Sequence, residues 1–123
     1  MKEAYFLDTY ALIEIVKGNK KYTKFLDSNL FTSIFNLYEL YYKLLRDYNE
    51  ETAKIYFFQF KQIIIEIKDE YIFLASKFRL QNVKKDFSYA DALGYAIALA
   101  NNLKFLTGDK EFKVFENVEF VTI

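Results

Sequence analysis

The sequence predicts an α/β fold in which helices cover both faces of a mainly parallel β-sheet. Short apolar runs that stop at a polar residue recur along the chain, which is typical of strands buried on both faces of a parallel sheet. Stretches with helical spacing of apolar residues separate these runs, and this alternation favours parallel strands joined by helices. The length of 123 residues fits one domain over residues 1–123.

The first strand and the helix after it illustrate the pattern. Residues 4–7 form an apolar run that stops at Asp8, so a buried strand is expected there. A helix is expected over residues 9–16, because apolar residues recur at helical spacing at Tyr10, Leu12, Ile13 and Val16. Asp8 is therefore expected at the carboxyl end of a central strand, where ligands bind in open α/β sheets.

A short surface helix over residues 19–27 and a short strand over residues 30–32 are expected next. Ser33 is a favourable N-cap for a helix over residues 34–47. The apolar stripe of that helix is expected to face the core and consists of Ile34, Leu37, Tyr38, Tyr41 and Leu45. At about 100° per residue, Glu39 lies off this stripe.

The middle of the chain is rich in aromatic residues. The helix expected over residues 50–62 contains Tyr56, Phe57, Phe58 and Phe60. These rings are too dense for one helix face, so part of the cluster is expected to contact a second copy of the chain in a homodimer, with coverage by the fold itself as the alternative. Residues 63–67 are mostly β-branched and predict a strand, and residues 69–81 predict a further helix.

The most apolar segment lies in the last third of the chain. A capping-box pattern from Ser88 to Asp91 begins a helix over residues 89–101, which is apolar on all sides and expected to be buried. Gly94 permits close packing of this helix, and Asn102 suits a left-handed C-terminal cap. The last elements expected are a strand over residues 104–107, a helical turn over 110–115 and a strand over 118–123.

The composition excludes several kinds of chemistry. The chain has no Cys and no His, which rules out disulfides, thiol nucleophiles, histidine bases and His-ligated zinc. Its three Gly are too scattered for a P-loop or a dinucleotide-binding motif. Catalysis must therefore use carboxylates, hydroxyls, Lys, Arg or a hard metal ion. No signal-peptide pattern or membrane-spanning run is recognisable, so a cytoplasmic location is expected.

Four acidic residues are candidates for a functional site, and each also has a structural explanation. Asp8 and Asp109 follow apolar strands, where a helix cap or a turn accounts for them. Asp91 occupies the third position of a capping box, although its charge is costly at the mouth of a buried helix. Glu39 can pair with Lys43 one turn further along the same helix.

Taken together, the four acids favour a site. Parallel strands with right-handed crossovers would bring them to one end of the sheet. Neighbouring carboxylates repel one another unless a cation lies between them, and oxygen ligands without His or Cys select Mg²⁺ or Mn²⁺. Two such ions about 4 Å apart stabilise the attacking and leaving oxygens of a phosphodiester displacement, which needs no histidine.

Four segments carry a family resemblance. They are the strand ending in Asp8-Thr9, then Tyr38-Glu39-Leu40, then Ser88-Tyr89-Ala90-Asp91-Ala92-Leu93 leading into Ala96 to Ala100, and finally Leu106-Thr107-Gly108-Asp109-Lys110-Glu111-Phe112. In this order and spacing they resemble the PIN domain, and in particular the small VapC-type ribonuclease toxins. The resemblance covers essentially the whole chain.

The resemblance implies a three-layer α/β/α fold and Mg²⁺- or Mn²⁺-dependent cleavage of RNA. It assigns the metal site to Asp8, Glu39, Asp91 and Asp109. It gives Thr107 and Thr9 supporting roles. It also implies a homodimer and a small antitoxin protein that covers the cleft.

Basic and aromatic residues near the acids are candidates for RNA contacts. The basic candidates are Lys43, Arg46 and Lys110, which ordinary surface charge explains as well. Phe35 and Tyr42 share the Glu39 side of their helix and are candidates to stack bases, with core or dimer packing as the alternative.

Two other functions remain open. One is a non-catalytic PIN-like module that binds RNA or protein, although such a module has no need of four converging carboxylates. The other is a different metal phosphohydrolase on a similar sheet. The haloacid-dehalogenase type would need a second Asp two residues after Asp8, where this chain has Tyr10. A metal-dependent endoribonuclease is the function that the sequence favours.

Overall fold

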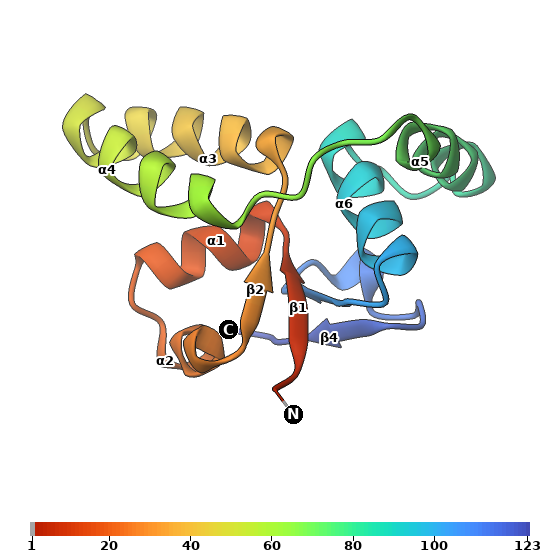
Figure 1. The fold of residues 1–123 in the computed structure, drawn as a ribbon, viewed down its shortest axis with the longest axis horizontal. Coiled ribbons are helices and arrows are strands. Elements are labelled where there is room, and N and C mark those ends of the chain that lie inside the picture. Colours follow the sequence, from red (N-terminus) through yellow and green to blue (C-terminus); the bar gives the residue numbers. More distant parts are fainter. Residues whose placement is uncertain (1) are drawn as a thin grey trace.

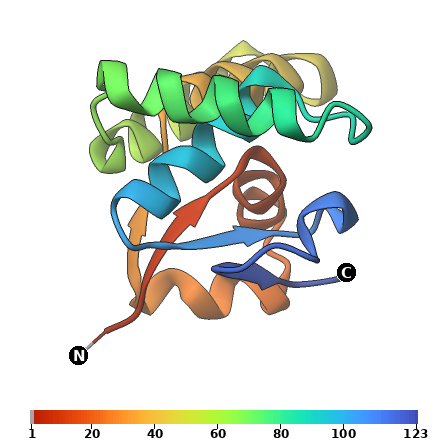
Figure 2. The same ribbon diagram turned by 90° about the vertical axis from the view of Figure 1, so that its right-hand side faces the viewer.

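The computed structural model describes residues 2–123 and contains a four-stranded sheet within that range. The strands are β1 (Ala4–Leu7), β2 (Asn29–Phe31), β3 (Lys104–Thr107) and β4 (Val118–Phe120). Their spatial order is β2-β1-β3-β4, and each neighbouring pair is parallel (Figure 2). Because Leu7 pairs with Leu106, the carboxyl ends of the two central strands lie side by side.

Helices cover both faces of the sheet (Figure 1). On one face lie α1 (Thr9–Val16), α2 (Lys20–Thr23), α3 (Ile34–Asp47) and α4 (Glu50–Phe60). On the other lie α5 (Asp69–Gln81) and α6 (Tyr89–Ala100). Short 3-10 turns occur at Lys24–Asp27, Lys61–Ile63 and Lys110–Phe112. In the described part of the chain, no helix has the length and apolar character needed to cross a membrane.

Two apolar clusters, one on each face, hold the layers together. Tyr5 and Leu7 of β1 pack with α1–α4, whereas Phe6 packs with α5 and α6. Phe105 and Leu106 of β3 divide in the same way. This alternation is the consequence of side chains pointing to opposite faces of a strand. The predicted three-layer α/β/α fold is confirmed, and its described strands are all parallel.

The helix α6 is buried, as predicted. A Cβ at Gly94 would lie 2.7 Å from the ring of Phe6, so only glycine allows this approach without a shift. Phe6 is fully buried and stacked on Phe105 with ring centroids 5.9 Å apart, which leaves it little room to move. Asn102 has a φ of 57°, as expected for a left-handed cap after the helix.

The predicted core stripe of α3 is largely wrong. Leu37 is buried, but Tyr38 is 72% exposed and Leu45 is 44% exposed. Ile34 is also exposed and Tyr41 is half-buried. The buried residues of the helix are Asn36, Leu37, Leu40 and Leu44. The helix carries two apolar stripes, and spacing alone does not identify the one that meets the core.

The predicted strand over residues 63–67 is wrong. This segment makes one isolated parallel bridge, between Ile64 and Thr32 just beyond β2. It links α4 on one face of the sheet to α5 on the other (Figure 1). Ile63 therefore packs in one apolar cluster and Ile65 in the other. β-branched residues suit any half-buried extended segment, so their enrichment does not by itself identify a strand.

Some predicted boundaries also shift. The helix expected over residues 19–27 divides into α2 and a 3-10 turn, and the helix expected over 50–62 gives way to a 3-10 turn after Phe60. The helical turn expected over 110–115 is a 3-10 turn that ends at Phe112, and the last strand ends at Phe120.

Candidate active site

The four acidic residues predicted from the sequence line one cavity. Asp8 and Asp109 follow the central strands β1 and β3, and Asp91 lies in the first turn of α6. Glu39 comes from the middle of α3. The cavity has a volume of about 850 Å³. Elements from both helical layers and from the sheet thus meet at the carboxyl ends of the strands, which is where open α/β sheets bind ligands.

Asp8 is held rigidly between α1 and β3. Its side chain is almost completely buried, and its Oδ1 accepts a hydrogen bond from the backbone N of Ala11 at 2.8 Å. Its Oδ2 accepts from Thr107 Oγ1 at 2.5 Å, and the backbone N of Asp109 donates to the same hydroxyl at 3.0 Å. Thr107 therefore connects Asp8 to the loop that carries Asp109.

Glu39 is positioned by a chain of buried polar groups. Thr9 Oγ1 donates to Glu39 Oε1 at 2.5 Å, and Asn36 Nδ2 donates to Thr9 Oγ1 at 3.2 Å. Ser33 Oγ in turn donates to Asn36 Oδ1 at 2.6 Å. Asn36 was not predicted from the sequence. Asn36 lies four residues before Leu40 and therefore on the same, buried face of α3. Because the core stripe of α3 was assigned to the wrong face, the sequence did not indicate that Asn36 is buried.

Burial raises the pKa of Asp8 to about 7. The hydrogen bonds from Thr107 and Ala11 act in the opposite direction, because they stabilise the carboxylate. The negative charges of Asp91 and Asp109 raise the pKa of Asp8 further. A buried carboxyl that faces like charges is the electrostatic situation that a bound cation relieves.

Asp91 combines a cap with a position in the cavity. Its Oδ2 accepts from the backbone N of Ser88 at 2.9 Å, and Ser88 Oγ accepts from the backbone N of Asp91 at 3.0 Å, which completes the predicted capping box. Burial raises the pKa of Asp91, and the charges of Glu39 and Asp109 add to this effect. The hydrogen bonds from Ser88 partly offset it.

In the structure, three of the four acids act as caps, which was the structural explanation offered for them. Asp8 caps α1, Asp91 caps α6, and Asp109 accepts from the backbone N of Glu111 at 2.9 Å at the start of a 3-10 turn. Capping does not exclude metal binding, because an ionised carboxylate has about four acceptor positions and a cap uses one or two of them.

The four carboxylates fit a hard divalent cation in their chemistry. Within residues 2–123, none of them forms a salt bridge with Lys or Arg. They offer only oxygen donors, which Mg²⁺ and Mn²⁺ prefer. In the same described range, no three acids stand close enough together to form a ready-made metal cluster. Each of the four carboxylates instead accepts a hydrogen bond within the protein, from a backbone N for Asp8, Asp91 and Asp109 and from Thr9 Oγ1 for Glu39.

Basic residues line part of the cavity. Of the predicted RNA contacts, Lys43 and Lys110 belong to its lining, whereas Arg46 does not and forms a two-point ion pair with Asp47 at 2.8 and 3.1 Å. Lys17 lines the cavity too and was not predicted from the sequence. It follows the end of α1 and pairs at 3.7 Å with Glu14, a buried acid that also lines the cavity.

The family model for the PIN domain matches residues 5–118. This match covers most of the chain, and the chain therefore belongs to the PIN-domain family. No curated protein matches it significantly in sequence.

Chains in solved structures of toxin–antitoxin complexes and of a toxin have the same fold. A toxin–antitoxin complex from Klebsiella pneumoniae matches with a TM-score of 0.78 at 19% identity, over 97% of this chain and 99% of that chain. VapBC2 from Rickettsia felis, bound to a promoter DNA fragment, matches with a TM-score of 0.76 at 23% identity, over 98% of each chain. Mycobacterium tuberculosis VapC20, a toxin that cleaves the sarcin–ricin loop, matches with a TM-score of 0.74 at 15% identity, over 93% of this chain and 98% of that chain. At these identities the likeness establishes the fold.

Proposed function

We propose that the protein is a Mg²⁺- or Mn²⁺-dependent endoribonuclease and the toxin of a toxin–antitoxin pair. The observation that carries this proposal is the set of four carboxylates around one cavity, without a salt bridge to any described Lys or Arg. The likeness to VapC20, which is described as cleaving the sarcin–ricin loop, supports RNA as the substrate.

The residues that would hold the metal are Asp8, Glu39, Asp91 and Asp109. When bound, Mg²⁺ or Mn²⁺ supplies stabilisation of negative charge on the oxygens of the phosphodiester group. Lys43 and Lys110, which line the cavity, would bind phosphates of the RNA backbone. Thr107 and Thr9 keep two of the acids in fixed orientations through the hydrogen bonds described above.

Cleavage of single-stranded RNA tests the proposal. RNA should be cut in Mg²⁺ or Mn²⁺ and left intact when EDTA is in excess. A parallel preparation of Asp8→Asn controls for co-purifying nuclease, since a contaminant would cut equally in both samples. Binding of RNA without cleavage in either metal would contradict the nuclease proposal and favour a non-catalytic PIN-like module.

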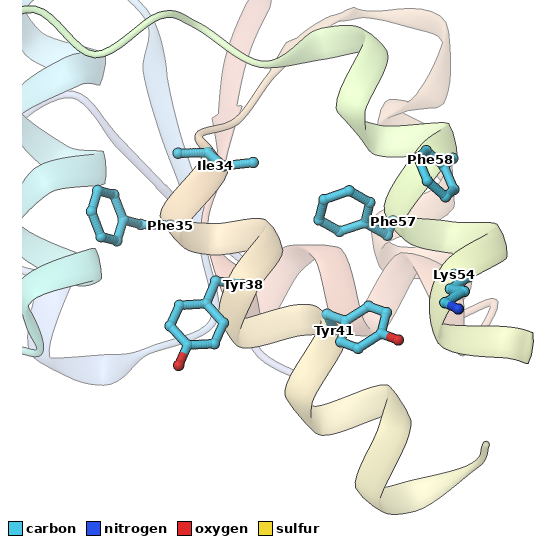
Figure 3. Close-up of a pocket in the computed structure, with 7 residues that line it drawn as sticks. All are labelled: Ile34, Phe35, Tyr38, Tyr41, Lys54, Phe57 and Phe58. Atoms are coloured by element: carbon cyan, nitrogen blue, oxygen red, sulfur yellow. The ribbon is translucent and has the colours of Figure 1, made fainter. Parts of the chain in front are cut away.

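An apolar groove between α3 and α4 supports a protein partner (Figure 3). It has a volume of about 660 Å³, and in its lining Tyr41 of α3 packs edge to face against Phe57 of α4 with ring centroids 6.0 Å apart. Phe58 beside it is 59% exposed, whereas Phe60 is buried, so part of the aromatic cluster lies outside the core. Exposed apolar patches of this kind mark protein interfaces. We propose that the antitoxin binds here and extends over the cavity.

We also propose that the protein forms a homodimer. Several large apolar side chains beyond the α3–α4 groove are exposed, among them Ile72, Phe73 and Leu80 on α5. A two-fold, self-complementary contact would bury such surface. Light scattering should therefore give twice the mass of the chain at micromolar concentration. A monomer at high micromolar concentration would contradict the homodimer.

A further inference from the structure

Two exposed tyrosines lie beside the acidic cavity on α3. Tyr38 is 72% exposed and Tyr42 is 59% exposed. Together with Glu39 and Lys43 they line a shallow hollow of about 310 Å³. Glu39 and Lys43 also line the acidic cavity, so the hollow and the cavity adjoin at these two residues of α3.

We infer that Tyr38 and Tyr42 stack against two neighbouring bases of single-stranded RNA and position the strand for entry into the acidic cavity. Lys43 contacts the phosphate of the same segment. This inference rests on the nuclease function proposed above and deepens it, because it defines the substrate as an unpaired strand whose bases are accessible from the side of Glu39.

The spacing of the two rings favours an opened strand. Tyr38 and Tyr42 are four residues apart on one helix, so they stand about 6 Å apart along its axis. Successive bases of a regular duplex strand are about 3.4 Å apart, so neighbouring stacked bases would not match the two rings. A single strand with separated bases matches the spacing, and each ring then takes one base. Aromatic platforms of this kind are the usual means of holding unpaired nucleotides.

The charges around the hollow favour a nucleic acid over an apolar protein segment. Lys43, which lines both the hollow and the cavity, forms no salt bridge within the described residues. Arg46 lies 5.8 Å from the centre of the Tyr42 ring and is paired with Asp47 through two contacts. Lys43 is therefore the unpaired cation at the hollow.

The hollow is also distinct from the apolar groove that we assign to the antitoxin. Tyr38 stands at the border between the two. Its hydroxyl points away from Tyr41 and Phe57, whose rings close the groove (Figure 3). Tyrosine combines a stacking face with a hydroxyl that bonds to phosphates or bases, which suits this border position.

Binding of a fluorescein-labelled, unstructured 12-nucleotide RNA tests the inference. The measurement uses Asp8→Asn protein in Mg²⁺, so that the strand is not consumed, and adds Tyr38→Leu and Tyr42→Leu singly and together. Each substitution should weaken binding about 5-fold or more, and the pair about 25-fold or more, since stacking against an aromatic ring contributes at least about 5-fold in Kd per base. Tyr→Phe at either position should retain most of the affinity, because the ring remains.

Tyr48→Leu is the matched control. Tyr48 follows the end of α3, is 53% exposed and lines neither the hollow nor the acidic cavity, so its loss should leave RNA binding unchanged. For an RNA with abasic residues at consecutive positions, the double variant and the protein with both tyrosines should have the same affinity, because there are no bases left to stack. In the otherwise active chain, the double variant should raise KM much more than it lowers kcat.

The possible outcomes distinguish failure of the stacking inference from failure of the nuclease proposal. Unchanged RNA affinity in the double variant, or no RNA binding by the parent protein, would overturn the stacking inference even if the chain cleaves RNA. A double variant that changes the oligomeric state while binding RNA normally would assign the tyrosines to a protein interface instead, and would also overturn it. Normal stacking effects in a chain that never cleaves RNA would overturn the nuclease proposal alone.

Discussion

Replacing Asp8 or Asp91 with Asn should lower the rate of RNA cleavage by more than about 100-fold while the protein stays folded. Even residues that only support metal ligands typically cost about 10- to 100-fold when they are changed, so loss of a ligand should cost more. Asn preserves the shape of both side chains and can still accept the hydrogen bonds from Ala11 and Ser88. The loss should therefore reflect the missing charge and not an unfolded helix.

Glu111→Gln is the matched control for this experiment. Glu111 lines the same cavity but is exposed and pairs with Lys85 at 3.3 Å, so it is not among the proposed ligands. Its substitution removes the same charge from the same cavity and should leave the cleavage rate within a few-fold. Folded Asp8→Asn and Asp91→Asn proteins that cut RNA at the wild-type rate would refute the assignment of these acids.

Without metal, the stability of the protein should fall as the pH rises from about 4 to about 7. The pKa of Asp8 is about 7 in the folded chain, against an ordinary value of 3.8. Its contribution to folding is therefore fully present below about 3.8 and is lost as the pH rises through about 7, because the folded chain retains a proton that the unfolded chain releases. The loss is on the order of 4 kcal/mol for a shift of this size. The raised pKa of Asp91 acts in the same direction.

Thermal melts in EDTA at several pH values measure this effect. The Asp8→Asn variant lacks the titrating group, so its melting temperature should change less than that of the wild type over the same pH range. The charges that face Asp8 are those of Asp91 and Asp109, and they remain in the variant. Parallel pH profiles for the two proteins would show that Asp8 does not titrate as the structure indicates.

Adding Mg²⁺ or Mn²⁺ at neutral pH should restore the stability that is lost when the buried Asp8 ionises. An ion that binds only the folded chain adds about 2.7 kcal/mol at 100 times its Kd, which corresponds to a rise of about 10 °C in Tm for a chain of this size. Asp8→Asn and Asp91→Asn should respond much less. Equal metal-induced shifts in all three proteins would mean that the acids do not form one site.

The two central strands and the acidic residues at their ends were predictable because local sequence pattern determines them. Residues 4–7 and 104–107 are apolar runs that stop at polar groups, and the helix from Tyr89 is apolar all round. Elements that are buried on all sides are recognisable in a sequence because they are continuously apolar. Asp8 and Asp109 follow from the ends of those strands. Their convergence follows from the parallel topology.

The parts that were not predictable depend on how elements pack. Tyr38 and Leu40 both fit an apolar stripe on α3, and only the position of the neighbouring helices decides that Leu40 is buried and Tyr38 exposed. The burial of Asn36 was not predictable for the same reason, because it depends on a tertiary contact with Thr9. The isoleucines of residues 63–67 are half-buried in a connection between layers, which a propensity for strands does not distinguish from a strand.

The most direct test of the central claim, that the four carboxylates form one metal site, is a crystal soaked in Mn²⁺ and measured by anomalous scattering. We expect a strong anomalous peak in the cavity, in contact with Asp8 and Asp91, with the carboxylates of Glu39 and Asp109 turned toward it. The peak should disappear in an Asp8→Asn crystal soaked in the same way. An empty cavity in the wild type at a saturating Mn²⁺ concentration, or a peak that persists unchanged in the variant, would contradict the claim.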